Sequence, residues 1–223
     1  MASIDKSTID FLKNLKENNN RDWFNEYKPE FQIEQQKAKD FYNALMLQLK
    51  SHDDIEKFKF FRIYRDVRFS KDKTPYKPHF AGSFSRATYR LRGGYYLRIR
   101  PGESFLAGGF WEPNKDDLLR IRKELELDAS ELRDIINQPS FKKFFGTLQG
   151  EELKSAPRDF DKTHPNIDLI RKKQYIFSIN YSDKEVSELG FINKLEYALK
   201  RVKPFTDYMS DVLTTDENGE SLF

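Results

Sequence analysis

The sequence predicts an α+β fold in which an antiparallel sheet of about four to six strands packs against N-terminal and C-terminal helices. Near both ends of the chain, apolar side chains recur every three or four positions, as they do in amphipathic helices. Between them, apolar and polar side chains alternate, as they do in strands. No repeat, low-complexity tract or linker rich in Pro, Gly and Ser interrupts the sequence, so we expect a single domain over residues 1–223.

Two helices are expected within residues 4–50. The first starts near Ile4 and continues until the asparagines at 18–20 interrupt its apolar pattern. The second starts near Pro29, since proline suits the first turn of a helix, and continues to about Lys50. Each has one apolar and one polar face, so each is expected to pack on a core.

Residues 58–111 are expected to form a meander of antiparallel strands. Apolar and polar side chains alternate from Phe61 to Phe69 and again from Tyr95 to Arg100. A further strand is expected at 79–84. Pro101-Gly102 suits a tight turn, after which residues 105–111 are read as the returning strand. The sheet should have an aromatic inner face and an arginine-bearing outer face.

The rest of the chain, residues 114–213, is expected to be helical with one further strand. The expected elements are helices at 114–127 and 128–138, an apolar stripe at 141–148, a strand at 175–181 and a long helix from 191. Asp128 and Glu131 have the spacing of a capping box. Pro139 should end one helix and Pro204 should kink or restart the last. The acidic tail, 214–223, is expected to fray.

Charge is strongly segregated along the chain. Between Arg62 and Arg100 lie eleven Lys and Arg residues but only two carboxylates, a local charge of +9. The whole chain has a net charge of only +3, so the remainder sums to −6. A basic block interleaved with aromatic residues indicates a surface or cleft for an anionic partner.

Composition excludes several kinds of site. The chain has no cysteine and three histidines, so disulfides, thiolate nucleophiles and Cys-based zinc sites are excluded and no metal site is predicted. No apolar run approaches the ~20 residues of a membrane span, and the N-terminus lacks the features of a secretory signal, so we expect a cytoplasmic protein without a membrane partner. No nucleotide-binding glycine motif occurs, and the cofactor is unknown.

The segment Ser70–Lys77 could present several donors to a phosphate, with Arg65 and Arg68 adding bidentate groups. The alternative is an ordinary solvated loop. The candidate ligand-binding residues are Arg62, Arg65, Arg68, Lys71, Lys73, Tyr76, Lys77, His79, Arg98, Arg100 and Arg158.

Three residues are candidates for catalysis: Asp66, Asp161 and His164. Asp161 precedes His164 by three positions in a loop flanked by prolines and could orient its imidazole for proton transfer. Asp66 either orients arginines for a ligand or belongs to a structural ion-pair network with its neighbours. A general acid/base site requires that Asp66, His79, Arg158 and His164 converge in space.

Three segments together resemble one known family. They are Arg65-Asp66-x-Arg68-Phe69-Ser70-Lys71-Asp72-Lys73-Thr74-Pro75-Tyr76-Lys77, Asn20-Arg21-Asp22-Trp23-Phe24 and Leu153-Lys154-x-x-Pro157-Arg158-x-Phe160-Asp161-x-x-His164-Pro165. Their sequence is similar to that of the family called domain of unknown function 2461, over nearly the whole chain. The resemblance implies membership of the family, but no catalytic residue and no substrate.

Two main functions fit these observations. One is an enzyme or binding protein for a phosphorylated or carboxylated small molecule, which the dispersal of the three segments favours. The other is a nucleic-acid-binding module in which basic strands follow phosphates and Tyr64, Tyr76, Tyr89 or Tyr96 stacks on bases; the near-neutral total charge speaks against it. A scaffold for an acidic protein is a third possibility. The oligomeric state is not predicted.

Overall fold

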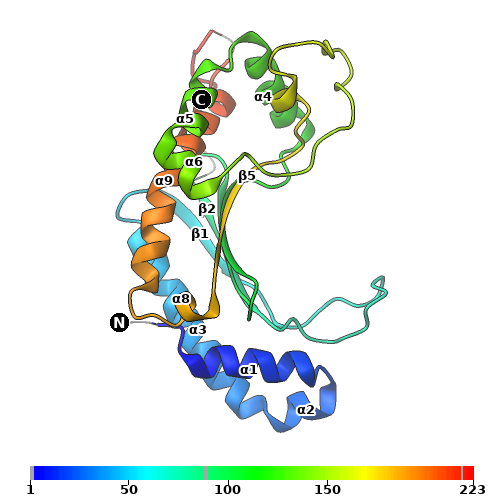
Figure 1. Ribbon diagram of the computed structural model, residues 1–223, viewed down its shortest axis with the longest axis vertical. Coiled ribbons are helices and arrows are strands. Elements are labelled where there is room, and N and C mark those ends of the chain that lie inside the picture. Colours follow the sequence, from blue (N-terminus) through cyan, green and yellow to red (C-terminus); the bar gives the residue numbers. More distant parts are fainter. Residues whose placement is uncertain (1–2, 88–89, 217) are drawn as a thin grey trace. The chain divides into compact units, whose positions relative to one another are not determined.

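The computed structural model describes residues 3–87, 90–216 and 218–223, and confirms an α+β fold. Within these residues the helices are α1 (Lys6–Glu17), α2 (Arg21–Glu26), α3 (Lys28–Leu49), α4 (Lys115–Leu127), α5 (Ser130–Asn137), α6 (Pro139–Phe145), α7 (Ile167–Ile170), α8 (Asp183–Val186) and α9 (Phe191–Thr214). The strands are β1 (Ile55–Phe60), β2 (Phe80–Arg86), β3 (Gly94–Ile99), β4 (Ser104–Phe110) and β5 (Tyr175–Tyr181). Figure 1 shows their course along the chain.

The five strands form one antiparallel sheet in the order β1-β2-β3-β4-β5. Each strand therefore pairs with its neighbour in sequence, which confirms the predicted meander and adds β5 at its end. The strand expected at Phe61–Phe69 is wrong, because the regular strand lies just before it, at β1. Alternation alone does not decide whether a partner strand continues beside a segment.

The chain forms two compact units, each assembled from separate segments. The first unit comprises Met1–Phe84, Tyr96–Leu106 and Asn180–Ala198. The second comprises Ser85–Tyr95, Ala107–Ile179 and Leu199–Phe223. Four strands and α9 contribute residues to both units. The expectation of a single domain stays a prediction.

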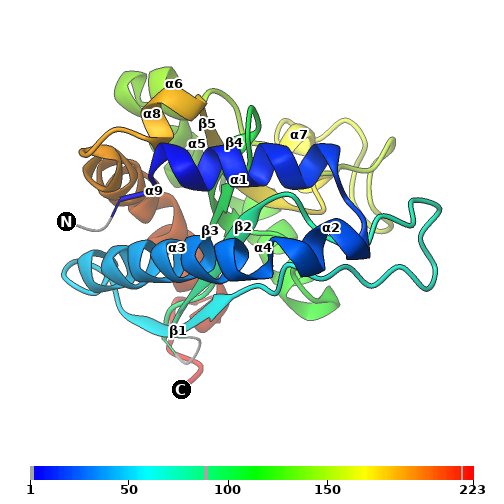
Figure 2. The same ribbon diagram turned by 90° about the horizontal axis from the view of Figure 1, so that it is seen from below.

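The N-terminal helices are close to those predicted, with one addition. Helices α1 and α3 run side by side in opposite directions (Figure 2). The run of asparagines ends α1, as expected, but it also starts the short helix α2. The side chain of Asn20 accepts a hydrogen bond of 2.9 Å from the backbone N–H of Trp23, which caps α2.

The C-terminal half confirms α4, β5 and α9 but corrects the helix ends. Asp128 and Glu131 do not form a capping box, because α5 starts only at Ser130. The Asp128 carboxylate instead accepts hydrogen bonds from the backbone N–H and the hydroxyl of Ser130, at 2.8 and 2.9 Å. Helix α5 ends at Asn137, just before Pro139, as expected, and Pro139 is the first residue of α6. Pro204 lies inside α9. In the tail, Thr215 and Ser221 form an isolated β-bridge.

Tyr42 of α3 is the centre of the core of the first unit. Its side chain is fully buried, and its ring centroid lies 5.3 Å from that of Phe60 and 6.3 Å from that of Phe84. Its hydroxyl donates a hydrogen bond of 3.1 Å to the carbonyl of Leu97. Burial raises the pKa of Tyr42 well above its ordinary value. Helix α3 thus covers one face of this part of the sheet with aromatic side chains.

We expect Gly82→Ala to destabilise the protein by about 1–3 kcal/mol, because it overpacks this core. A Cβ at position 82 would lie 2.7 Å from the Tyr42 ring and 2.9 Å from that of Phe58. Gly190→Ala is the control, because nothing lies within 4 Å of a Cβ there. Urea denaturation of both variants measures the difference. Equal stabilities of the two variants would contradict this packing.

Candidate anion-binding site

Residues 61–79 connect β1 to β2 and extend away from the sheet (Figure 1). We call residues 62–76 of this connection the arm. The two sides of the arm are antiparallel: the Arg65 N–H donates to the Pro75 carbonyl at 2.9 Å, and the Lys77 N–H donates to the Ile63 carbonyl at 2.8 Å. Tyr64 and Tyr76 form an isolated β-bridge between them. The alternation that predicted a strand here is real, since odd positions from 63 to 67 are more buried than their even neighbours.

Asn19 fixes the base of the arm. Its side-chain amide donates to the Tyr76 carbonyl at 2.9 Å, and its side-chain oxygen accepts from the Tyr76 N–H at 3.1 Å, as a neighbouring strand would. The Phe24 ring stacks on the Tyr76 ring at 3.9 Å. Tyr76, predicted to bind ligand, is therefore a buried packing residue. Nothing in the sequence pointed to Asn19 beyond its place in a helix-breaking run of asparagines.

Arg65 holds the tip of the arm together. Its guanidinium donates to the Asp72 carboxylate and the Thr74 hydroxyl, and lies 3.4 Å from the Ser70 hydroxyl. Asp72 also accepts from the Thr74 N–H at 2.9 Å. Together, the hydrogen bond from the Thr74 backbone and the one from Arg65 lower the pKa of Asp72 to about 2. These contacts assign Arg65 to the structure of the arm.

Asp66 and Arg68 form a forked ion pair. The Arg68 Nε and Nη2 donate to the two oxygens of Asp66 at 3.0 and 2.7 Å. These hydrogen bonds lower the pKa of Asp66, and the positive charge of Arg62 lowers it further. Lys73 donates to the Val67 carbonyl at 2.9 Å. The geometry therefore favours the structural ion-pair interpretation of Asp66 over a catalytic one. Lys71 is exposed.

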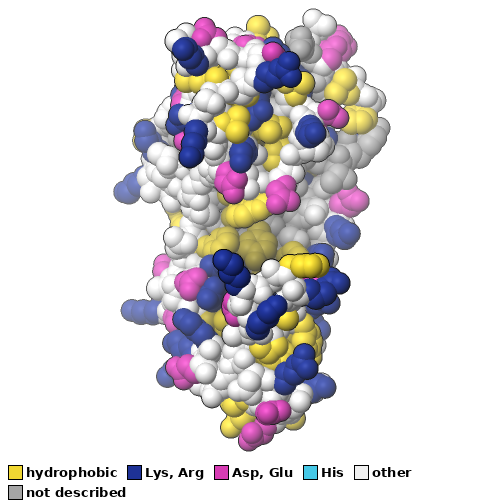
Figure 3. Space-filling view, turned by 90° about the vertical axis from the view of Figure 1, so that its right-hand side faces the viewer, with side chains coloured by type: hydrophobic (Ala, Val, Ile, Leu, Met, Phe, Trp, Pro, Cys, Tyr) yellow, Lys and Arg dark blue, Asp and Glu magenta, His cyan; other side chains and the backbone are white. Residues whose placement is uncertain are grey.

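Arg62, on the arm, is exposed. The other four predicted ligand-binding residues of the first unit lie near one another, since the charges of three of them act on the fourth, His79. We call Lys77, His79, Arg98 and Arg100 the cation cluster. In β3, Tyr95, Leu97 and Ile99 are buried, so the alternating side chains, Arg98 among them, point to the opposite face and are half-buried. Figure 3 shows Lys and Arg side chains beside hydrophobic ones on one face of the molecule.

Positive groups in the cation cluster raise one another's electrostatic energy. Burial first, and then the charges of Arg98, Arg100 and Lys77, lower the pKa of His79 to about 4. Burial also lowers the pKa of Lys77, with contributions from Arg62, Arg65 and Lys59. His79 is therefore neutral at pH 7.

Two polar atoms in the cation cluster lack a hydrogen-bond partner among the described residues. They are the Nδ1 of His79 and the Nε of Arg100, and both are buried. Glu103 supplies negative charge: its carboxylate lies 3.5 Å from the Arg98 Nη2 and 3.3 Å from the Arg100 Nη1. Its backbone carbonyl accepts from the Arg98 Nε at 3.3 Å. One exposed carboxylate thus faces two arginines, with a lysine and a histidine beside them.

The remaining candidates lie in the second unit. Asp161 does not orient His164 as expected: its carboxylate accepts from the Thr163 N–H and hydroxyl, both at 2.8 Å. The Nδ1 of His164 instead accepts from the Asn166 N–H at 3.1 Å. Arg158 is almost fully exposed, beside Asp159. Convergence of His164 and Arg158 with the residues of the first unit stays a prediction, and Tyr89 lies outside the described residues.

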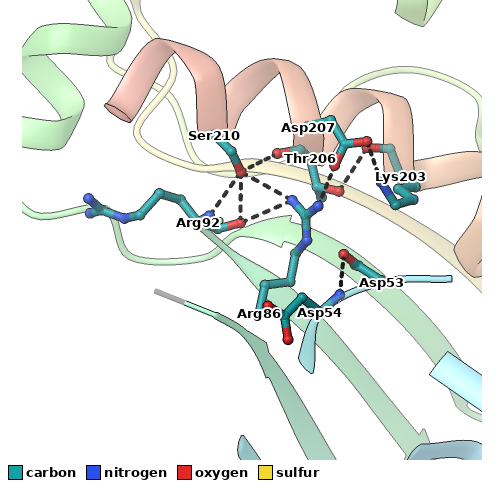
Figure 4. A network of polar contacts seen from close by, with 8 residues as sticks. All are labelled: Asp53, Asp54, Arg86, Arg92, Lys203, Thr206, Asp207 and Ser210. Carbon is teal, nitrogen blue, oxygen red and sulfur yellow. Dashed lines mark hydrogen bonds and ion pairs between the residues drawn. The ribbon is translucent and has the colours of Figure 1, made fainter. Parts of the chain in front are cut away.

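Arg86 and Arg92 of the basic segment have structural roles in the second unit. The fully buried guanidinium of Arg86 points at α9, where it donates to Asp207 and, at 3.1 Å, to the Ser210 hydroxyl (Figure 4). Ser210 also accepts from the Arg92 N–H at 2.8 Å, and the Arg92 side chain pairs with Asp117. These arginines connect the end of β2 to the last helix.

We expect Asp207→Ala to lower the free energy of unfolding by about 3 kcal/mol, because it removes a carboxylate from a buried guanidinium. Lys203→Ala is the matched control, since Lys203 pairs with the same carboxylate at 2.6 Å but is more exposed than Arg86. This variant should lose less than about 1 kcal/mol of the free energy of unfolding. Chemical denaturation measures both. A control as damaging as Asp207→Ala would show that the buried contact is not the important one.

The low pKa of His79 predicts a pH-dependent stability. Between pH 4 and 6.5 this histidine binds a proton in the unfolded chain but not in the folded one, so the free energy of unfolding should rise with pH in that window. Its contribution is at most about 1.4 kcal/mol per pH unit. His79→Asn should flatten the dependence. Denaturation curves at several pH values test this, and a parental slope in the variant would refute it.

Other kinds of site find no support in the described residues. None of their helices combines the length and apolar character that a membrane crossing requires. They also contain no group of three or more His, Asp or Glu side chains placed to hold a metal ion.

Comparison with known proteins identifies the family but no close relative. Searches of the curated proteins and of the solved structures found no match. The model of a family described as "Conserved hypothetical protein (DUF2461)" matches residues 7–208, which include all but the first residue of α1, the arm, the whole sheet and most of α9. The family resemblance seen in the three sequence segments is thereby confirmed, and the chain belongs to the DUF2461 family.

Proposed function

We propose that the cation cluster binds the anionic group of a phosphorylated or carboxylated small molecule. The observation that carries this proposal is the crowding of Lys77, Arg98 and Arg100 around a half-buried histidine whose pKa is lowered to about 4. The carboxylate of Glu103 supplies one negative charge against these three positive ones. A folded protein gains no stability from the like charges left in excess in a partly desolvated place. Such an arrangement is typical of a binding site for the opposite charge.

An anion would satisfy the groups that the fold leaves without partners. The unpartnered Nε of Arg100 is a permanent donor, and the Nδ1 of His79 can donate once the ring takes up a proton. Hydrogen bonds between an ionised donor and a phosphate or carboxylate are about twice as strong as neutral ones. An anion would also oppose the positive potential that keeps His79 neutral.

The same groups could support a reaction on the bound compound. A neutral imidazole can accept a proton, and the neighbouring cations can stabilise negative charge that develops on a substrate. For an enzymatic function, we propose His79 as the residue of the first unit that transfers the proton.

Replacing Arg100 tests the position of the site. We expect Arg100→Gln to weaken binding of the anion about tenfold or more, because it removes charge-assisted hydrogen bonds. Arg68→Gln is the matched control: Arg68 is in the same basic segment, but Asp66 already holds it. Isothermal titration calorimetry with inorganic phosphate and with citrate, at one fixed low salt concentration, measures both.

The outcomes separate three cases. A loss confined to Arg100→Gln supports the cation cluster. An equal or larger loss in Arg68→Gln would move the site to the arm. If the parent protein binds neither phosphate nor citrate, the proposal is wrong.

Nucleic-acid binding is the second candidate, and the tip of the arm favours it. Phe69 is 97% exposed there, beside the largely exposed Arg68. An exposed ring next to a cation can stack on an unpaired base. Binding of a single-stranded oligonucleotide that falls steeply with added salt, and that Phe69→Leu weakens, would favour this function.

A further inference from the structure

A row of three aromatic side chains lies on the same face of the sheet as the cation cluster. The ring centroid of Tyr96 is 6.1 Å from that of Phe61 and 5.6 Å from that of Phe105, and we call these three residues the aromatic row. All three are half-buried, whereas the aromatic residues around Tyr42 on the opposite face include fully buried ones. The aromatic row therefore keeps ring surface that the fold does not use.

Arg98 belongs to both sets. Its guanidinium lies 4.5 Å from the centroid of the Phe105 ring, and its charge helps to lower the pKa of His79. Tyr96 precedes Arg98 by two positions in β3, so the two side chains emerge on the same face. The aromatic row and the cation cluster are thus neighbouring parts of one surface.

The rings of the aromatic row contact one another and could also stack on a planar ligand. The ring pairs are tilted, at 56° and 37°, and not stacked face to face. Lys59 lies 5.1 Å from the centroid of the Phe61 ring, so a second cation borders the aromatic row. The Tyr96 hydroxyl is protonated at neutral pH and can donate a hydrogen bond. Aromatic side chains next to cations bind bases by stacking, without requiring a particular base.

We infer that the small molecule bound at this surface is a phosphorylated compound that carries a planar aromatic ring, such as a nucleoside monophosphate. Its phosphate would meet the cation cluster and its ring would lie on the aromatic row. This inference rests on the proposed anion binding and adds the chemical nature of the rest of the ligand. It involves no covalent step.

Calorimetric titration with four compounds tests the inference: adenosine monophosphate, ribose 5-phosphate, adenosine and inorganic phosphate, at the same low salt. We expect adenosine monophosphate to bind about tenfold more tightly than ribose 5-phosphate, because base stacking on an aromatic side chain is worth about one such factor or more. Tyr96→Leu should abolish that advantage while the affinity for ribose 5-phosphate is kept. Phe61→Leu is a second variant, in case Tyr96→Leu does not fold.

Phe69→Leu is the control, because it removes an aromatic ring of the same unit that lies on the arm and not in the aromatic row. It should keep the parental preference for adenosine monophosphate. Equal affinities for adenosine monophosphate and ribose 5-phosphate would overturn the inference but leave the anion site intact. If the protein binds citrate but none of the phosphorylated compounds, the inference is likewise overturned while the anion site is left intact. If none of the anions binds, the proposed function fails together with the inference.

Discussion

The packing of α3 against one face of the sheet is the constraint on which the candidate site depends. Because Tyr42 and the aromatic residues around it bury that face, every second residue of β3 must point the other way. Arg98 and Arg100 therefore emerge on the outer face together. The register of a strand is fixed when one of its faces is buried, so the core determines which arginines meet. The site is a consequence of how the core is filled.

The arm shows a different use of the same charges. Most of its predicted binding residues have partners within the arm: Arg65 with Asp72 and Thr74, Arg68 with Asp66, and Lys73 with a backbone carbonyl. Ordering a nineteen-residue connection without regular structure costs conformational entropy. The internal ion pairs and the contact of Asn19 with Tyr76 help to offset that cost. The excess of charge in the sequence thus divides between ion pairs that order the arm and the cation cluster, for which we propose anion binding.

The interaction partners of each basic residue, more than its position in the sequence, distinguish a structural role from a proposed role in anion binding. Arg86 is fully buried and pairs with Asp207, so its charge is compensated inside the second unit. Lys77 is half-buried in the first unit. Its pKa is lowered first by burial and then by the positive charges of Arg62, Arg65 and Lys59. Compensated buried charges hold a structure together, whereas crowded positive charges create a potential that attracts an anion. That difference is why we propose the cation cluster, and not the arm, as the site.

Features that depend on near neighbours in the chain could be predicted from the amino-acid sequence. Side-chain periods and turn residues predicted α1, α3, α4, α9 and four of the five strands, and a structural ion-pair network was one of the two roles predicted for Asp66. The periods did not predict that Phe61–Phe69 would leave the sheet, since a strand also needs a partner. Contacts between distant segments required the three-dimensional structure: Asn19 holds Tyr76, 57 residues away, Arg86 is buried, and His79 meets Arg98 and Arg100. Local periods are set by backbone geometry, whereas partners are set by which distant segments the core brings together.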